Sequence, residues 1–262
     1  MSRAAGLLLG LFLPLAATAA TPPPPVLYVG VRGEVTRTGT LGVTRGARLA
    51  RIALSVGVKP DAYPLGAAWM TPSRERAQTE LKAGLGFDLT VLADAAQLRG
   101  ESALAKLVSR WRAWLASMPV TGRRTGLVLD PRRLELAHVN PLVVGGATLY
   151  YPSRPDTVRV VGAVRAPCAR RFVAMQAARD YLAGCAYARG AEPDWILVIE
   201  PDGHVTRRGI GAWNSQPPIP VAPGALIYVP LGQAALQAMR DPHFNRDMAR
   251  FLATQPLPEA AP

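Results

Sequence analysis

The sequence predicts an α+β protein built from two similar small sheets in tandem. A glycine turn, a short apolar strand and a proline that ends it occur at residues 145–152 and again at 223–230. An alternating strand occurs at 27–32 and again at 158–165. Similar segments in the same order are typical of an internal repeat, and two copies favour a pair of domains over a solenoid.

Residues 1–20 have the pattern of a secretory signal peptide. Arg3 precedes an apolar run at 6–15, and residues 17–19 form a small-x-small cleavage site. A membrane anchor is the alternative, but it needs about 20 apolar residues. Residues 21–25 then form a stiff Pro-rich leader. We therefore expect an exported, soluble mature protein.

The first unit, residues 26–152, is predicted to begin with strands at 26–32 and 38–43 and a helix at 47–57. A hairpin is expected much later, at 127–136, with its turn at Asp130-Pro131. The last strand is the one that ends at Pro152. The order strand, strand, helix, hairpin, strand indicates a β-grasp-like unit.

The second unit, residues 157–231, has the same order of elements, without a long segment before its hairpin. Strands are expected at 158–165 and 171–174, followed by a helix at 178–185. Asp202-Gly203 lies between alternating apolar runs, which is a strong hairpin signal. A second β-grasp-like unit is therefore predicted.

The hairpin of the first unit comes late in the sequence because a helical insertion is expected before it, at 71–122. Thr71-Pro72 is a cap followed by a proline at the first helical position. Apolar side chains recur every three or four residues from Leu104 to Met118. We expect a helical hairpin that packs on the first unit; an arm that binds a partner is the alternative.

Residues 232–262 are predicted to form a helical tail. Asp241 and Pro242 suit a helix start, and an apolar stripe contains Phe244, Met248, Phe251 and Leu252. This amphipathic helix either docks on its own domain, lies on a membrane or joins a partner's helix.

The chain carries 30 Lys and Arg against 18 Asp and Glu, a formal net charge of +12. An exported cationic protein attracts acidic polysaccharide, anionic lipid or nucleic acid. A generally solvated basic surface is the alternative. Because no run of Arg and Lys with interleaved aromatic residues occurs, nucleic acid is not an expected partner.

No catalytic constellation is evident. The three histidines lack the spacing of metal ligands, and the sequence has no nucleophile, phosphate-loop or zinc-protease motif. We expect no catalytic residues, no metal and no cofactor. Cys168 and Cys185 are the two cysteines, and in an oxidising compartment such a pair predicts a disulfide. Cys185 as a small buried apolar side chain is the alternative.

A family resemblance is carried by several short motifs in a fixed order. They are Pro119-Val120-Thr121-Gly122-Arg123, Leu129-Asp130-Pro131, Asn140-Pro141-Leu142, Thr157-Val158 with Gly162, Pro201-Asp202-Gly203, Trp213-Asn214 and the segment 223–229. In this order they resemble the GfcC family of capsule-biosynthesis proteins over nearly the whole mature chain. The cysteine pair and the long Pro-rich leader depart from the family pattern.

The resemblance implies a periplasmic protein with no established enzymatic activity. It implies two β-grasp domains similar to those of Wza-type polysaccharide export channels, a helical hairpin in the first and an amphipathic C-terminal helix. The expected partners are capsular or exopolysaccharide, the outer-membrane export machinery, or both. We expect a monomer that acts in assembly or export by binding. An enzyme that modifies an acidic polysaccharide is the alternative.

Three residues are candidates for binding. Arg123 corresponds to the arginine of the family's Thr-Gly-Arg motif; its guanidinium suits a carboxylate or sugar hydroxyls, or else carbonyl groups at the end of the insertion. Trp213 and Asn214 form the second candidate site, because an indole ring stacks on a sugar face. Alternatively, Trp213 caps a core.

Overall fold

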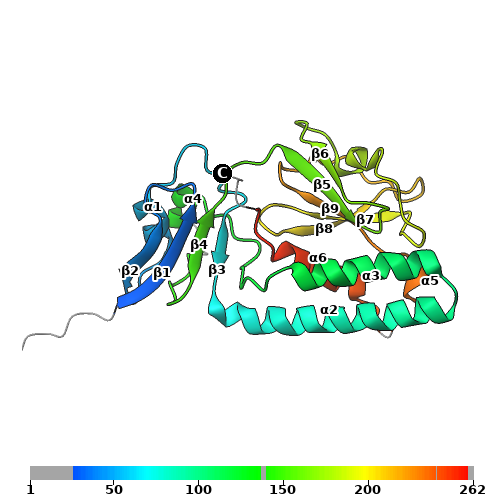
Figure 1. Ribbon diagram of the computed structural model, residues 1–262. Helices are drawn as coiled ribbons and strands as arrows, with labels where there is room; N and C mark the ends of the chain where they lie inside the picture. Colours follow the sequence, from blue (N-terminus) through cyan, green and yellow to red (C-terminus); the bar gives the residue numbers. More distant parts are fainter. Residues whose placement is uncertain (1–25, 137–139, 240, 259–262) are drawn as a thin grey trace, which may run out of the picture.

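The computed structural model describes residues 26–136, 140–239 and 241–258. The signal peptide and the Pro-rich leader predicted at 1–25 lie outside these residues. Two mixed sheets lie side by side, and a long helical hairpin extends along the second one (Figure 1). The fold is therefore α+β, as the sequence predicts.

The first sheet contains β1 (Val26–Gly33), β2 (Gly39–Thr44), β3 (Ala68–Met70) and β4 (Thr148–Tyr151), in the order β2-β1-β4-β3. The strands β1 and β4 are parallel, and the other pairs are antiparallel. Helix α1 (Leu49–Ser55) buries its apolar side chains against one face of this sheet. This packing forms a separate core for the first unit.

The second sheet contains β5 (Thr157–Gly162), β6 (Cys168–Arg171), β7 (Trp195–Ile199), β8 (Val205–Gly209) and β9 (Leu226–Val229), in the order β6-β5-β9-β7-β8. Its first and last strands, β5 and β9, are parallel neighbours, as β1 and β4 are in the first sheet. The antiparallel pair β7 and β9 corresponds to the pair β3 and β4. Strand β8 has no counterpart in the first sheet.

The hairpin predicted at 127–136 is wrong. Its second half is helix α4 (Pro131–Leu136). Asp130 caps this helix, because its carboxylate accepts hydrogen bonds from the backbone N–H groups of Arg132 (3.0 Å) and Arg133 (3.4 Å). An Asp-Pro pair is a helix-start signal, and it prevails here over the alternation of leucines that suggested a strand.

Two details of the second unit also differ from the prediction. Strand β6 ends at Arg171, where the expected strand was to begin. The expected helix at 178–185 is a short 3₁₀ helix, η1 (Ala178–Leu182). The helix ends at Leu182 because Ala183 leaves the helical region with ψ 123°, and Gly184 follows in a left-handed conformation with φ +74°.

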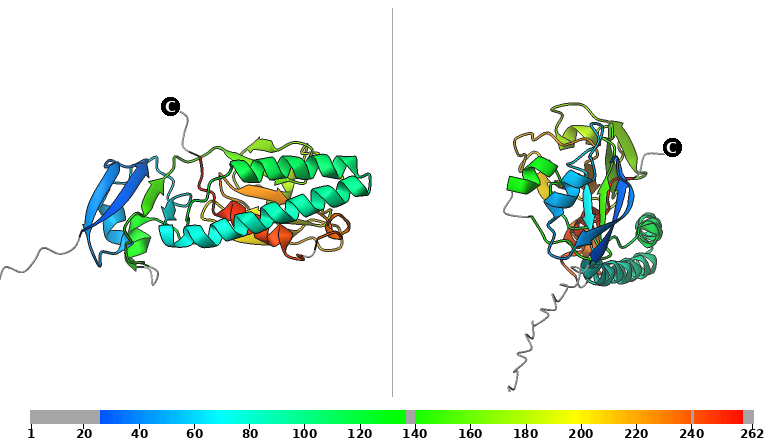
Figure 2. Two further views of the ribbon diagram at one scale, coloured as in Figure 1. Left: turned by 60° about the horizontal axis from the view of Figure 1, so that its bottom comes forward. Right: turned by 90° about the vertical axis from the view of Figure 1, so that its left-hand side faces the viewer.

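The insertion is a helical hairpin, formed by α2 (Pro72–Leu98) and α3 (Ser102–Ser117). The expected packing on the first sheet is not observed. The hairpin packs on the second sheet (Figures 1 and 2). Trp111 of α3 is 4% exposed and donates a hydrogen bond from Nε1 to the carbonyl oxygen of Gly162 at the end of β5 (3.1 Å). The insertion therefore joins the core of the other unit.

The physical reason lies in the second sheet. Leu197 lies opposite Tyr228, and Ile199 lies opposite Leu226. Opposed residues share a face, so these four side chains form an apolar surface that we call the Tyr228 face. The ring of Trp111 lies 5.8 Å from that of Tyr228. Exposure of such an apolar face to water is unfavourable, and α3 shields part of it.

The rest of the cover comes from the tail, which contains α5 (Gln233–Leu236) and α6 (Phe244–Ala253). Phe244, Met248 and Phe251 are 0% exposed, and α6 contacts α2, β7 and β8. The apolar stripe of α6 thus docks on the chain itself. Among the described residues, no helix has both the length and the apolar character needed to cross a bilayer.

Candidate functional site

Arg123 is placed by a tight backbone turn at the exit of the helical hairpin. Gly122 has φ +66°, and a Cβ atom there would lie 2.3 Å from the carbonyl oxygen of Thr71. The Gln78 side chain accepts a bond from the Gly122 N–H (2.8 Å) and donates one to the Arg123 carbonyl (3.0 Å). Only glycine fits this turn, which accounts for the Thr-Gly-Arg sequence.

The guanidinium of Arg123 is occupied by backbone carbonyls. It donates to the oxygens of Ala253 at the end of α6 (3.4 Å), of Gln255 beyond it (2.9 Å), of Ala67 before β3 (3.4 Å), and of Pro201 between β7 and β8. These contacts join the first sheet, the second sheet and the tail. The residue is only 3% exposed, which favours the structural alternative for Arg123 over the binding role.

Burial acts on the charge of this group as well. It lowers the pKa of the Arg123 guanidinium to about 10, while the nearby Asp202 carboxylate opposes this shift. The group therefore stays charged at neutral pH, and its charge assists the bonds to the carbonyls. Its Nε is buried without a hydrogen-bond partner among the described residues.

A cavity of about 220 Å³ lies beside Arg123, with Arg159, Glu200 and the segment 252–258 among its walls. Burial raises the pKa of the Glu200 carboxyl group, which accepts a hydrogen bond from the Ala222 N–H (3.1 Å). The described lining contains one carboxyl group and no Ser, Cys or His side chain. No group of three or more His, Cys, Asp or Glu in the described ranges has the geometry of a metal site.

Asn214 anchors a loop. Its Nδ2 donates to the carbonyl oxygen of Asp194 just before β7 (3.1 Å). A Cβ atom at Gly209 would lie 2.1 Å from the Asn214 carbonyl oxygen, so the loop lies against the end of β8. The amide nitrogen of Asn214 thus holds the backbone, and the binding role of this residue stays a prediction.

Trp213, the neighbour of Asn214, is 72% exposed. Its ring meets that of Trp195 edge to face, with centroids 6.1 Å apart. The loop anchor thus holds an indole at the surface without burying it, and Trp213 does not cap a core.

Trp195 also carries a stacked cation. The guanidinium carbon of Arg207 lies 3.6 Å from the centroid of the Trp195 ring. Arg207 is paired with Leu197, two residues after Trp195, so both side chains project from the Tyr228 face. The residue paired with Trp195 is Gly209, whose missing side chain leaves the indole face open to the arginine.

Trp195, Leu197 and Arg207 line a groove of about 630 Å³. The groove lies between the β7–β8 end of the Tyr228 face and α6 with the segment that leads into it. We call it the Trp195 groove. Its walls include Glu192, Trp195, Leu197, Arg207, His243, Arg246 and Arg250. Arg246 and Arg250 both contact the Asp247 carboxylate, at 3.4 and 3.1 Å. Three arginines against one glutamate give the described lining a surplus of positive charge.

The sequence interpretation selected Trp213 but missed Trp195, Arg207 and the groove. A signal for them exists in the hairpin: a short turn at 201–203 between alternating strands fixes the register and puts Arg207 on the same face as Trp195. The sequence contains no comparable signal for α6 as the opposite wall.

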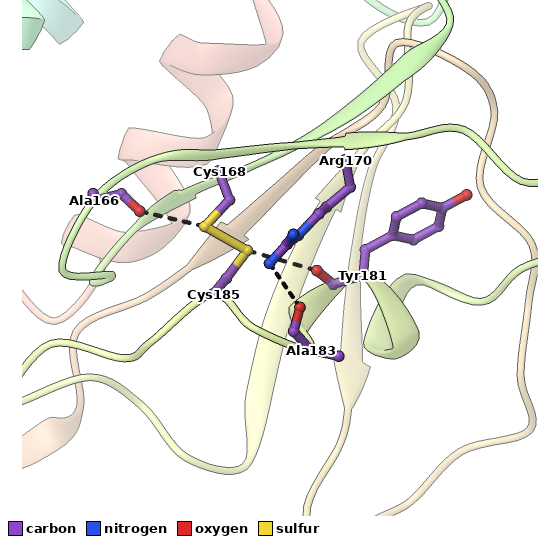
Figure 3. Close-up of a disulfide and its surroundings, with 6 residues drawn as sticks. All are labelled: Ala166, Cys168, Arg170, Tyr181, Ala183 and Cys185. Carbon is purple, nitrogen blue, oxygen red and sulfur yellow. Dashed lines mark hydrogen bonds between the residues drawn. A yellow bond between two sulfur atoms is a disulfide. The ribbon is translucent and has the colours of Figure 1, made fainter.

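Cys168 of β6 and Cys185 after η1 form a disulfide, with Cα atoms 6.1 Å apart (Figure 3). This distance is within the range of ordinary disulfides. The guanidinium of Arg170 lies beside the pair and donates to the Ala183 carbonyl oxygen (2.9 Å). The bridge therefore holds the segment after η1 to the edge strand.

Comparison with known proteins shows a similarity to one capsule-biosynthesis family and to a bacterial relative. Residues 167–256 match the family model "Capsule biosynthesis GfcC C-terminal". The "Uncharacterized protein YjbG" of Escherichia coli (strain K12) is 29% identical over 184 residues, which cover 64% of this chain and 74% of that protein. The matched family segment contains the strands β6, β7, β8 and β9 and the helix α6. It also contains every wall residue named for the Trp195 groove.

Proposed function

We propose that this protein is a non-catalytic periplasmic accessory factor in the assembly or export of capsule or exopolysaccharide, because residues 167–256 match the GfcC C-terminal family model of capsule biosynthesis. Its partner is the glycan, the outer-membrane export machinery, or both. The signal-peptide pattern at 1–20 supports the periplasmic location.

We further infer that both units are β-grasp domains, with boundaries at 26–152 and 157–231. In each sheet the first and last strands are parallel neighbours, and the second strand lies outside the first. The first unit departs from this pattern where α4 replaces the fourth strand. This departure is local, because the pairing of the remaining strands corresponds in the two sheets.

The observation that carries the proposal is the Trp195 groove together with the exposed Trp213, whose ring meets that of Trp195 edge to face. An indole offers an apolar face to the C–H face of a sugar ring, while guanidinium groups donate to its oxygen atoms. The volume of about 630 Å³ is within the usual range of ligand sites. By contrast, the cavity beside Arg123 is smaller, and that arginine donates to four carbonyls already.

Gene deletion and complementation test the proposal. Loss of the protein is expected to reduce the polysaccharide outside the cell, and the wild-type gene restores it. The Trp213→Ala variant should restore little, although the protein accumulates normally. Arg76→Ala is the control, because the Arg76 side chain is 90% exposed on α2 and is not part of the groove lining. Unchanged export in the deletion strain contradicts the proposal.

A further inference from the structure

We propose that the Trp195 groove is specific for an acidic glycan, a polymer whose sugar residues carry carboxylates. This inference rests on the proposed function and names the class of glycan that the same site takes. It follows from the way in which the structure holds three guanidinium groups around one aromatic platform.

Arg207 is pre-organised for a carboxylate. The guanidinium carbon lies 3.6 Å from the centroid of the Trp195 ring, and this contact restricts the conformations of the Arg207 side chain. A planar fork in a fixed orientation matches a carboxylate by two parallel hydrogen bonds, and little side-chain entropy remains to be lost.

The opposite wall adds charge that is only partly neutralised. The side chains of Arg246 and Arg250 are 59% and 62% exposed, and they share the single carboxylate of Asp247. Glu192 is the one acidic side chain in the described lining of the groove. Three arginines against the two carboxylates of Glu192 and Asp247 leave a positive charge that a neutral glycan does not balance, whereas carboxylates along a polymer do.

The other hollows of the described chain have fewer arginines. The hollow on the first sheet contains one arginine, Arg32, which lies 5.7 Å over the Tyr150 ring, and its Lys59 pairs with Glu34 at 3.2 Å. The hollow at the tip of the helical hairpin contains a paired Arg99 and Glu101, and no aromatic residue lines it. The Trp195 groove combines a close Arg-Trp stack with three arginines in its lining.

The groove is also open to a chain that extends past it. Strand β8, which contributes Arg207, is an edge strand of its sheet. Trp213 projects at the surface next to Trp195, so a sugar residue that leaves the groove meets a second indole. The geometry thus suits several consecutive residues of a polymer.

Binding of oligogalacturonate, compared with its methyl ester of the same length, tests the inference. The two probes share their sugar backbone and differ in charge. The purified mature protein is titrated with each, and intrinsic tryptophan fluorescence is followed. We expect the acid to bind at least about tenfold more tightly than the ester, with an affinity that falls as salt is added.

Arg207→Ala is expected to lose about tenfold in affinity for the acid and to change the affinity for the ester little. Arg76→Ala is the matched control, since the Arg76 side chain is 90% exposed on α2, outside the groove. Thermal melts of both variants verify that the fold is intact. Trp213→Ala should weaken the binding of both probes.

Equal affinity for the acid and the ester would overturn the inference, as would the absence of binding to the acid. An Arg207→Ala variant that binds the acid as well as the wild type would also overturn it. The proposed function fails differently, because it fails when deletion of the gene leaves the amount of exported polysaccharide unchanged.

Discussion

The indole Nε1 of Trp111 lies 3.1 Å from the carbonyl oxygen of Gly162, and this bond joins an insertion in the first unit to a strand of the second. The Trp111 ring also stacks on Phe244 of α6, with centroids 6.2 Å apart and planes inclined by 14°. One side chain thus contacts the hairpin, the second sheet and the tail. The two units cannot separate without exposing this core.

Trp111→Ala is therefore expected to destabilise the whole chain. Removal of a large buried aromatic side chain costs about 3–5 kcal/mol. Urea unfolding measures the loss. Trp213→Ala is the matched control, because Trp213 is 72% exposed and its loss should change the free energy of unfolding by no more than about 0.5 kcal/mol. Similar losses for the two variants would contradict the packing described for Trp111.

Arg123→Ala should lower the melting temperature rather than remove a binding site. The change leaves several buried carbonyl groups without a donor, at a cost of about 1–3 kcal/mol or more. Arg123→Lys is expected to restore only part of the stability, because an ammonium group cannot reach carbonyls on opposite sides of a planar fork. Normal thermal stability of Arg123→Ala, together with weakened glycan binding, would return Arg123 to a binding role.

Glu200 gives a prediction for pH. Its folded-state pKa is raised above the ordinary value of a glutamate because burial disfavours the carboxylate. Its contribution to stability is therefore fully present below the unfolded pKa, and is lost as the pH rises through the folded pKa. Glu200→Gln keeps an oxygen acceptor for the Ala222 N–H and removes the titration.

We expect Glu200→Gln to be more stable than the wild type at neutral pH, with a smaller decline in stability between acidic and neutral pH. Urea unfolding at several pH values measures both effects. A wild-type protein that gains stability relative to the variant as the pH rises from acidic to neutral would contradict the assigned direction of the shift.

The bond between Cys168 and Cys185 should stabilise the protein. The two residues are 17 positions apart, and closing a loop of this length is worth about 3 kcal/mol. Addition of dithiothreitol should lower the melting temperature of the wild type and leave that of the Cys168→Ser, Cys185→Ser double variant unchanged. The double variant should melt close to the reduced wild type. Equal melting of the oxidised and reduced wild type would show that the bridge carries no stability.

Local signals predicted much of the fold. The Asp202-Gly203 turn lies between β7 and β8, and Thr71-Pro72 marks the start of α2. The same kind of signal was misjudged at Asp130-Pro131, where leucine alternation outweighed a helix start. The sequence does not indicate on which sheet the hairpin packs, because the apolar stripe of α3 fits any apolar face. It packs on the second sheet because the Tyr228 face there would otherwise be exposed to water.

The candidate site shows the same limit. Arg123, Trp213 and Asn214 were identified by motif, but whether a polar group faces solvent or backbone depends on segments far away in sequence. The partners of Arg123 include Gln255, 132 positions later. The Trp195 groove combines a local hairpin register with an opposite wall from α6, and only the first of these can be inferred from sequence.

The most direct test of the central claim, action by binding without catalysis, uses the exopolysaccharide of the native cell. The purified protein is incubated with this polymer, the mixture is separated by size exclusion, and the polymer's mass and reducing ends are measured. We predict that the wild type elutes with the polymer, that a variant combining Trp213→Ala and Arg207→Ala does not, and that mass and reducing ends stay unchanged. New reducing ends or a shift in the polymer's mass, lost in an Arg123→Ala or Glu200→Gln variant, would contradict the account and establish an enzyme.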